Sequence, residues 1–300
     1  MTIRFDGRVA IVTGAGGGLG RAHALALAAR GARVVVNDVG NADGVVEEIR
    51  ASGGEAMASA ASVTDAGAVA EMVRNTMERW GRVDILVNNA GILRDRSFLK
   101  MTLEDFRAVI DVHLMGAVHC LHAVWPIMRE QGYGRIVNTT SSVGLYGNFG
   151  QANYGAAKMA LVGLMNVLHL EGAKYDIRIN CLAPCARTKM TEGLVPDEIL
   201  SLWDPEAVSP GVLFLVSEDA PSRVILDAGC GGFARTYIYE TEGMAFAPEN
   251  NTPESIAQRW AEISHPATPL EQPHSGTQGV KFALQAAAAR GLGELPVAAG

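Results

Sequence analysis

The chain has 300 residues, of which 48% are hydrophobic and 19% charged, and its formal net charge is −7. This composition is typical of a folded α/β enzyme and excludes a disordered chain. Nucleic acid is not expected as the main partner, because phosphate binding requires clustered Lys and Arg. The four cysteines show no Cys-x-x-Cys spacing, so we expect neither a metal site nor a disulfide framework. We also expect no membrane span and a cytoplasmic location, since Met1–Arg8 leads directly into a strand and no apolar run reaches transmembrane length.

Short runs rich in Val and Ile alternate with longer segments of helical periodicity. Near-continuous apolarity is typical of strands that are covered on both faces. Strands that alternate with helices predict an α/β fold with a doubly wound parallel sheet. In chain order we expect strands at Val9–Val12, Arg33–Asn37, Glu55–Ala58, Val83–Val87, Arg135–Asn138, Ile177–Cys181 and Arg223–Asp227, and helices at Leu19–Arg30, Asp43–Ala51, Asp65–Trp80, Leu103–Glu130 and Ala152–Tyr175.

The character of the sequence changes after about Gly243. The apolar content beyond this point is too thin for a core of its own, so we expect one domain, residues 1–243, followed by a C-terminal extension, residues 244–300. Short helices are expected at Pro253–Ser264 and Lys281–Ala289. The first should pack near the substrate mouth or against a neighbouring subunit, because its apolar residues require burial; they are Ile256, Trp260 and Ile263.

A glycine-rich segment, Thr13–Gly20, follows the first expected strand and begins the first helix. In this position small residues let the backbone approach a pyrophosphate, which the N–H groups of the helix start then bind. Asp38, at the end of the second strand, can accept hydrogen bonds from the adenosine ribose and would repel a 2′-phosphate, so the sequence favours NAD over NADP. The predicted cofactor contacts in the glycine segment are Gly14, Gly17, Gly18, Leu19 and Gly20.

Asn88–Gly91 ends the fourth expected strand, at the sheet edge where ligands bind in open α/β sheets. We expect Asn89, Ala90 and Gly91 to contact the cofactor. Residues of these types also simply turn the chain, and this stretch alone does not distinguish the two interpretations.

Tyr154 and Lys158 lie four positions apart near the start of an expected helix, so their side chains share a face. Hydride transfer from an alcohol also requires a proton acceptor, and a nearby ammonium would lower the pKa of a tyrosine toward that task. Ser141, just beyond the fifth strand, would orient the substrate oxygen. Each residue alone has an ordinary structural explanation, but their joint spacing on a dinucleotide fold favours a catalytic set.

These motifs, in this order and spacing, resemble the short-chain dehydrogenase/reductase family. The resemblance implies a single Rossmann-type domain that forms a homodimer or homotetramer through the helices at Asp111–Arg129 and Tyr154–Tyr175. It also implies that Pro184 and Thr188 hold the nicotinamide carboxamide, although Cys185 stands where the family usually has Gly.

Two longer strings, Asn88–Phe98 and Tyr146–Tyr154, resemble a narrower group, the (3R)-hydroxyacyl-CoA dehydrogenase modules of peroxisomal multifunctional enzymes type 2, also called 17β-hydroxysteroid dehydrogenase type 4. The similarity extends over about Ile3 to Ile263. It implies oxidation of a 3-hydroxyacyl thioester or a hydroxysteroid, with a separate hydratase as a pathway partner.

Three features depart from the wider family or from the module. His113 stands where most of the family has an Asn that positions a relay water; it is either part of a proton relay or a buried helix histidine beside His119 and His122. Ser62-Val63 replaces the frequent Asp-Val near the adenine, as in the module, and the loop Val39–Gly44 is shorter than the module's.

The leading hypothesis is therefore an NAD-dependent 3-hydroxyacyl-CoA or hydroxysteroid dehydrogenase. The alternatives are a dehydrogenase of another hydrophobic alcohol or ketone, and a non-catalytic NAD-binding regulator. A CoA ester would require basic contacts, for which Arg94, Arg96 and Lys189 are candidates, although each is equally well explained as solvated surface charge.

Overall fold

The computed structural model describes residues 2–187 and 202–292. The chain divides into two compact units, Met1–Thr236 and Tyr237–Gly300. The first unit contains the eight-stranded sheet and the helices that cover it, and the described part of the second contains a two-stranded antiparallel ladder and three α-helices.

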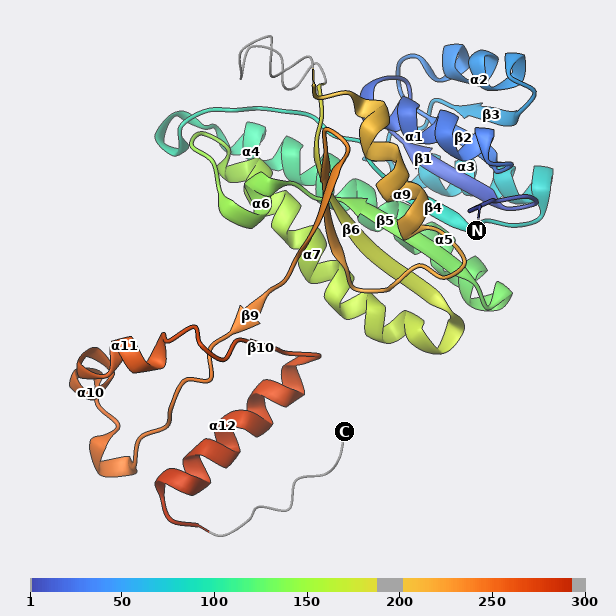
Figure 1. Ribbon diagram of the computed structural model, residues 1–300. Helices are drawn as coiled ribbons and strands as arrows, with labels where there is room; N and C mark the ends of the chain where they lie inside the picture. The colour runs from blue at the N-terminus through green and yellow to red at the C-terminus, as the bar shows by residue number, and fades with distance from the viewer. Residues whose placement is uncertain (1, 188–201, 293–300) are drawn as a thin grey trace. The chain divides into compact units, whose positions relative to one another are not determined.

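The first unit is built on one eight-stranded sheet in the order β3-β2-β1-β4-β5-β6-β7-β8 (Figure 1). Strands β1 to β7 are parallel, which confirms the expected doubly wound fold, and the strand order reverses between β1 and β4. Ligands bind at such a switch point in open α/β sheets. The strands are β1 (Val9–Thr13), β2 (Arg33–Asn37), β3 (Glu55–Ser59), β4 (Ile85–Asn88), β5 (Gly134–Thr139), β6 (Ile177–Cys185), β7 (Ile225–Gly229) and β8 (Gly232–Thr236).

Strand β8 was not expected from the sequence. It pairs antiparallel with β7 at the edge of the sheet. Four of its five residues are exposed, so it lacks the buried apolar run by which the other strands can be recognised.

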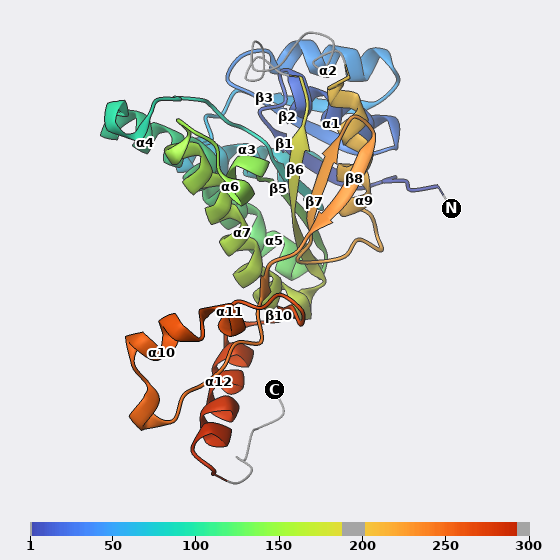
Figure 2. The same cartoon turned by 60° about the vertical axis from the view of Figure 1, so that its left-hand side comes forward.

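Helices cover both faces of the sheet, as Figure 2 shows. Successive strand residues point to opposite faces, so Ala10 and Val12 of β1 join a core with α1, α2 and α9, whereas Ile11 joins a second core with α3, α5 and α7. The α-helices in the described part of this unit are α1 (Gly18–Ala29), α2 (Ala42–Ala51), α3 (Ala66–Trp80), α4 (Leu103–Ile110), α5 (Gly116–Gln131), α6 (Ser142–Tyr146), α7 (Ala152–Gly172) and α9 (Ser209–Leu215).

The helix expected at Leu103–Glu130 is interrupted by one π-helical turn, Asp111–Met115, between α4 and α5. Contrary to expectation, the joined segment Leu103–Gln131 is long and apolar enough to cross a membrane by length and composition, because an 18-residue window in it has a mean hydropathy of 1.4. Its apolar face nevertheless packs in the core, where Cys120, Val124 and Met128 are fully buried. One face of the segment therefore belongs to the core, and 39% of its most apolar window is buried.

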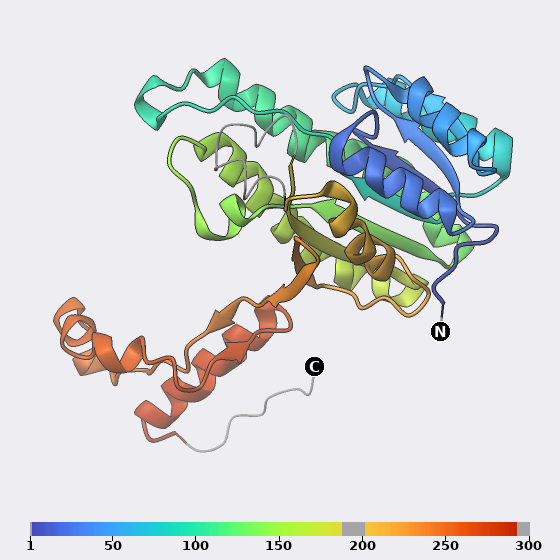
Figure 3. The ribbon, with the colours of Figure 1, turned by 45° about the horizontal axis from the view of Figure 1, so that its top comes forward.

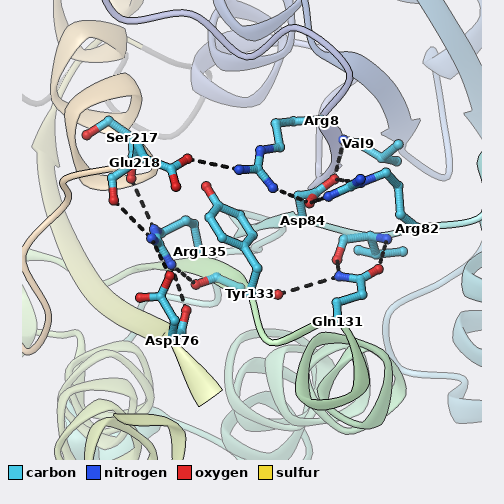
Figure 4. Close-up of polar contacts among 12 residues, drawn as sticks. Arg8, Val9, Arg82, Asp84, Gln131, Tyr133, Arg135, Asp176, Ser217 and Glu218 are labelled. Carbon is cyan, nitrogen blue, oxygen red and sulfur yellow. Dashed lines mark hydrogen bonds and ion pairs between the residues drawn. The ribbon is translucent and has the colours of Figure 1, made fainter. Parts of the chain in front are cut away.

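A charged network ties together the amino ends of the central strands (Figure 4). Asp84, with a fully buried side chain, accepts hydrogen bonds from Arg8, from Arg82 and from the backbone N–H of Val9. Arg135, also fully buried, binds the Asp176 carboxylate at 3.0 Å and the backbone carbonyls of Ser217 and Glu218. The Tyr133 ring lies between the guanidinium groups of Arg8 and Arg135. The buried charges are thus paired, as their burial requires.

The second unit contains β9 (Tyr239–Glu240), β10 (Leu270–Glu271), α10 (Pro253–Gln258), α11 (Trp260–Ile263) and α12 (Ser275–Ala289). The helix expected at Pro253–Ser264 is thus divided at Arg259. Lys281 of α12 pairs with Glu240 and donates to the Thr241 carbonyl. Trp260 is 61% exposed and Ile256 is 44% exposed.

Candidate active site

The glycine segment turns from β1 into α1 at the carboxyl edge of the sheet, and two of its glycines are required by close packing. Gly14 has φ +64°, and a Cβ there would lie 2.7 Å from the Ala90 Cα. A Cβ on Gly20 would lie 2.2 Å from the Gly14 carbonyl oxygen. The loop therefore packs against the end of β4 without room for any side chain at these positions.

The outer side of the same loop is open. Gly17 is the N-cap of α1, and a Cβ on it would meet nothing within 4 Å. No side chain caps α1, and its first turn, which includes Gly18 and Leu19, contains no acidic residue. The N–H groups of this turn can therefore bind an anionic group such as a pyrophosphate.

Asp38 lies directly beside this loop. Its carboxylate accepts hydrogen bonds from the Gly16 N–H at 2.9 Å and from the Gly40 N–H at 2.8 Å. Each carboxylate oxygen can accept more than one hydrogen bond, so both retain the capacity to bind ribose hydroxyls. This donor and acceptor set fits a dinucleotide.

Asn89 ties the end of β4 to the glycine loop. Its side-chain amide donates to the carbonyls of Thr13 and Gly14, and the N–H groups of Asn89 and Ala90 donate to the Thr13 hydroxyl. These bonds shape the loop from beneath. Gly91 is required here as well, because a Cβ on it would lie 2.3 Å from the His113 ring.

The remaining predicted cofactor residues lie at neighbouring strand ends. The Ser62 hydroxyl contacts the Thr64 hydroxyl at 2.8 Å, and the Val63 carbonyl contacts His119 Nδ1 at 2.8 Å. Pro184 is partly buried and Cys185 is exposed at the end of β6. Thr188 and Lys189 lie outside the described residues.

Ser141, Tyr154 and Lys158 meet at the carboxyl edge of β5. Ser141 caps the short helix α6, with its hydroxyl accepting from the Val143 N–H at 3.1 Å. Tyr154 and Lys158 lie in the first two turns of α7, and the Lys158 Nζ is 5.4 Å from the centre of the Tyr154 ring. Lys158 Nζ also donates to the Thr139 carbonyl at 2.5 Å. The structure thus brings the three predicted residues together.

Burial dominates the proton affinities of this group. It raises the pKa of Tyr154, while the hydrogen bond from Ser141 acts in the opposite direction. It also lowers the pKa of Lys158 to about 7. The lowered tyrosine pKa expected from the sequence is thus not found in the protein by itself, because desolvation of the phenolate outweighs its neighbours. A lysine with a pKa near neutrality can both accept and release a proton at working pH.

His113 lies in the π-helical turn and is 4% exposed. Its ring meets the Tyr154 ring edge-on, with the centres 5.1 Å apart. Its Nε2 lies 2.8 Å from the Ile92 carbonyl oxygen and 3.0 Å from the Ile92 nitrogen, so either tautomer finds a backbone partner. Burial lowers the pKa of His113 to about 3, with a further contribution from Lys158. The imidazole is therefore neutral at physiological pH.

A small cavity of about 10 Å³ is lined in part by Lys158. Its size is roughly that required by one water molecule. Three polar atoms of its lining residues have no hydrogen-bond partner among the described parts of the chain; they are His113 Nδ1, Asn88 Oδ1 and Thr139 Oγ1. The residues that line the cavity therefore offer several hydrogen-bonding atoms to a water molecule, and Lys158 is one of these residues.

Sequence reasoning did not assign roles to Asp95, Gln151 and Asn153, although all three belong to the two long strings quoted above. Gln151 donates to the Asp95 carboxylate at 2.9 Å, and Asn153 donates to the Arg94 carbonyl at 3.0 Å. The occurrence of both unusual strings, Asn88–Phe98 and Tyr146–Tyr154, in one chain could have indicated that their residues contact one another. Arg94 and Arg96 are exposed, and the Arg94 guanidinium lies 3.6 Å from the Asp105 carboxylate.

A profile of the short chain dehydrogenase family matches residues 8–199. The peroxisomal hydratase-dehydrogenase-epimerase of Saccharomyces cerevisiae is 48% identical over 276 residues, which cover 87% of this chain. This chain spans only 30% of that protein's length. A short-chain type dehydrogenase/reductase of Mycobacterium tuberculosis is also 48% identical, over 86% of this chain and 94% of its own length.

Solved structures give the same picture. The full-length peroxisomal multifunctional enzyme type 2 of Drosophila melanogaster superposes with a TM-score of 0.85 and 37% identity, over 96% of this chain and 51% of the other. A 7α-hydroxysteroid dehydrogenase complexed with NADH and 7-oxo glycochenodeoxycholic acid superposes with a TM-score of 0.72 and 32% identity, over 76% of this chain and 95% of the other.

Proposed function

Because the chain belongs to the short-chain dehydrogenase/reductase family, we propose that it oxidises the secondary alcohol of a 3-hydroxyacyl-CoA or a hydroxysteroid with NAD. The observation that carries this proposal is the convergence of Ser141, Tyr154 and Lys158 at one strand end, beside a loop built for a dinucleotide. The similar proteins named above support both substrate classes. They include a peroxisomal hydratase-dehydrogenase-epimerase, a peroxisomal multifunctional enzyme type 2 and a 7α-hydroxysteroid dehydrogenase.

The chain's own residues would bind the substrate and move its proton. Ser141 would orient the substrate oxygen, and Tyr154 would take the hydroxyl proton; a bound NAD would supply the acceptor for the hydride. Lys158 would bind the nicotinamide ribose, and its positive charge and that of the ring would offset the burial that raises the pKa of Tyr154. A water molecule in the cavity lined by Lys158 and His113 would pass the proton onward from Lys158.

The substrate class is tested with a panel of 3-hydroxyacyl-CoA thioesters, in both configurations at C3 and several chain lengths, and of hydroxysteroids. NADH formation at the expense of a member of either class supports the proposal. Inactivity on every thioester and steroid, together with turnover of other hydrophobic alcohols or ketones, would support the second hypothesis instead.

The preference for NAD is proposed from Asp38, whose carboxylate lies beside Gly16 where a 2′-phosphate would approach. Asp38→Asn keeps the size of the side chain and removes its charge, although its amide nitrogen cannot accept one of the two backbone hydrogen bonds. We expect the ratio of kcat/KM for NAD over that for NADP to fall by about tenfold or more, the effect of roughly 1.4 kcal/mol of lost repulsion. An unchanged ratio would contradict the proposal.

A non-catalytic NAD-binding regulator is distinguished by Tyr154→Phe. For an enzyme, this variant should lose at least about a thousandfold in kcat and still bind NADH, since it lacks only the proton-transferring hydroxyl. A regulator would retain its output. The presence of Ser141 and Lys158 in contact range of Tyr154 favours the enzyme.

A homodimer or homotetramer through α5 and α7 is part of the proposal. Four large apolar side chains of the π-turn and α7 are 37–54% exposed, as expected of a surface covered by a partner; they are Met115, Met159, Val167 and Leu170. Light scattering of wild type and Leu170→Glu tests it, because a charge at the contact should reduce the measured mass.

The cytoplasmic location is likewise a proposal, and imaging of the tagged chain tests it.

A further inference from the structure

The two strings that set this sequence apart from the wider family contact one another beside the catalytic tyrosine. One contains Ile92–Phe98, which we call the strap, and the other contains Gly147–Gln151, which we call the entry loop because it leads into α7. The Arg96 N–H donates to the Gly150 carbonyl at 2.9 Å. Figure 3 shows the chain segments after β4 and around α6 projecting on the same side of the sheet.

Asp95 is the acidic residue of the strap, and it is tied to the start of α7 through side chains. Asn148 donates to the Gln151 side-chain oxygen at 2.8 Å, and Gln151 Nε2 donates to Asp95 Oδ2 at 2.9 Å. Gln151 is the N-cap of α7, and its backbone carbonyl accepts from the Gly155 N–H at 2.8 Å. A carboxylate on the strap thus orients the residue that begins the catalytic helix, one turn before Tyr154.

The strap is held from its other end by the π-helical turn. Ile92 contacts the His113 ring through its backbone, and His113 in turn meets the Tyr154 ring. Asn153, fully buried and adjacent to Tyr154, donates to the Arg94 carbonyl. The position of Asp95 relative to Tyr154 is therefore defined by contacts on both sides.

The polar and titratable groups near Tyr154 come from four elements. Lys158 of α7 is a base with a pKa of about 7, Ser141 after β5 is a neutral hydrogen-bond partner, His113 of the π-turn is neutral, and the exposed Asp95 of the strap is the acidic group. Burial is the largest influence and raises the pKa of Tyr154, and the charge of Asp95 acts in the same direction. A negative charge near a phenol disfavours the phenolate.

We propose that Asp95 is a positioning residue for the reaction, because through Gln151 it holds the start of α7, one turn before Tyr154. This inference rests on the proposed function. The protonated tyrosine is the proton donor for ketone reduction, and its phenolate is the acceptor for alcohol oxidation. The charge of Asp95 acts to raise the pKa of Tyr154, so it should in addition favour the donor form.

Three variants separate the effect of the Asp95 charge from the effect of its hydrogen bond with Gln151, which we call the tie. Asp95→Asn removes the charge, and its side-chain oxygen can still accept from Gln151. Gln151→Ala removes the tie and leaves the charge, and Asp95→Ala removes both. Glu130→Gln, at an exposed position near the end of α5, is the matched control for loss of one negative charge.

The pH profile of kcat/KM for oxidation reports the proton affinity of Tyr154. For Asp95→Asn we expect the acid limb to move to lower pH by about 0.5 unit, the effect of one partly screened charge, which is about threefold in kcat/KM below the limb. The alkaline limb of the reduction should move by the same amount. Gln151→Ala should lower the plateau kcat about threefold or more, the effect of losing one orienting hydrogen bond, and leave the limb in place.

A second measurement does not depend on substrate. The tyrosinate ultraviolet absorbance of each variant, minus that of the same variant with Tyr154→Phe, follows this hydroxyl alone, and Asp95→Asn should lower its midpoint. An unchanged or raised limb and midpoint in Asp95→Asn would overturn the role of the charge, as would an equal shift in Glu130→Gln. Wild-type kcat in Gln151→Ala would overturn the tie. If no thioester or steroid is oxidised, the proposed function fails, while the absorbance titration still decides the role of Asp95.

Discussion

At the scale of single residues, His113 differs most from the family pattern. The sequence left two interpretations open, a relay group or a buried histidine. The structure shows a buried, neutral imidazole that contacts the Ile92 backbone, the Tyr154 ring and the cavity lined in part by Lys158. A side chain with a pKa of about 3 does not titrate in the working range. In a proton relay, His113 would therefore act by hydrogen-bonding to a neighbouring group in the relay. It would not itself become charged.

This argument predicts the behaviour of two variants. His113→Asn should lower kcat by roughly fivefold, the effect of about 1 kcal/mol for a poorer hydrogen bond, and His113→Ala should lower it further. Neither should move the limbs of the pH profile between about pH 5 and pH 9, because the imidazole is neutral throughout that range. Steady-state kinetics over this range would check it; the loss of a limb in His113→Asn would show that the imidazole titrates.

The same shift predicts how stability depends on pH. In the unfolded chain His113 binds a proton below about pH 6.5, whereas in the folded chain it does so only below about 3. Between these values the unfolded state binds more protons, so the free energy of unfolding falls as the pH is lowered from about 6.5 to about 3. Urea unfolding at several pH values should show a smaller fall for His113→Asn than for wild type. An equal fall in both proteins would contradict the neutral, buried state.

At the scale of elements, the turn from β1 into α1 shows that a sequence can predict where a glycine motif lies. It does not predict which role each glycine has. The position of the segment between an apolar strand and a helix was visible in the sequence. Which glycines are needed for packing and which leave room for a ligand depends on Ala90 and Asn89, about 70 residues later in the chain.

Gly17→Ala and Gly20→Ala should consequently fail in different ways. A Cβ on Gly20 would strike the Gly14 carbonyl, so this variant should lower the free energy of unfolding by about 1–3 kcal/mol, the usual cost of overpacking. A Cβ on Gly17 meets no protein atom within 4 Å, so this variant should unfold like wild type but bind NADH at least about tenfold more weakly. Denaturant unfolding and fluorescence titration would test the pair. Similar stability losses in both variants would contradict the assignment.

The π-helical turn could not be predicted. The apolar periodicity of Leu103–Glu130 favours one continuous helix, no Gly or Pro lies within Asp111–Met115, and the single Gly116 that follows is also tolerated inside a helix. The turn places His113 against Gly91 and Ile92, which is a contact between distant parts of the chain. Single π-turns occur frequently at functional sites, and here the turn lies beside the catalytic tyrosine.

At the scale of the whole molecule, the two ends of the sheet have different tasks. The carboxyl ends of the strands carry the proposed site, and the amino ends of the central strands are joined by the network around Asp84 and Arg135. Stability and chemistry should therefore be separable by mutation.

Asp84→Ala leaves Arg8 and Arg82 without their shared partner. We expect the free energy of unfolding to fall by about 3 kcal/mol, the lower part of the range for breaking a buried pair, because both arginines are partly exposed. NADH affinity of the folded variant should be unchanged. Urea unfolding and NADH titration would test both statements, with Asp6→Ala, at an exposed ion pair, as the control. A comparable loss in the control would contradict the importance of burial.

The C-terminal segment remains a prediction at this scale. Pro253–Ser264 is expected to pack near the substrate mouth or against a neighbouring subunit, since Trp260 and Ile256 are exposed in the single chain. A chain ending at Thr236 should retain NADH binding, because the glycine loop, Asp38 and the catalytic residues all precede that point. Its substrate affinity or its oligomer mass should change. If both stay the same, the prediction is wrong.

The sequence by itself determined the fold class, the glycine-rich turn from β1 into α1 and the closeness of Tyr154 and Lys158. These features depend on local periodicity and on fixed positions at strand ends, which the topology brings together in only one way. Only the tertiary structure decided the π-turn, the edge strand β8, the neutral state of His113, the low proton affinity of Lys158 and the tie between Asp95 and Gln151. Each of these depends on burial or on contacts between residues distant in sequence, and neither quantity is encoded by the pattern of a single segment.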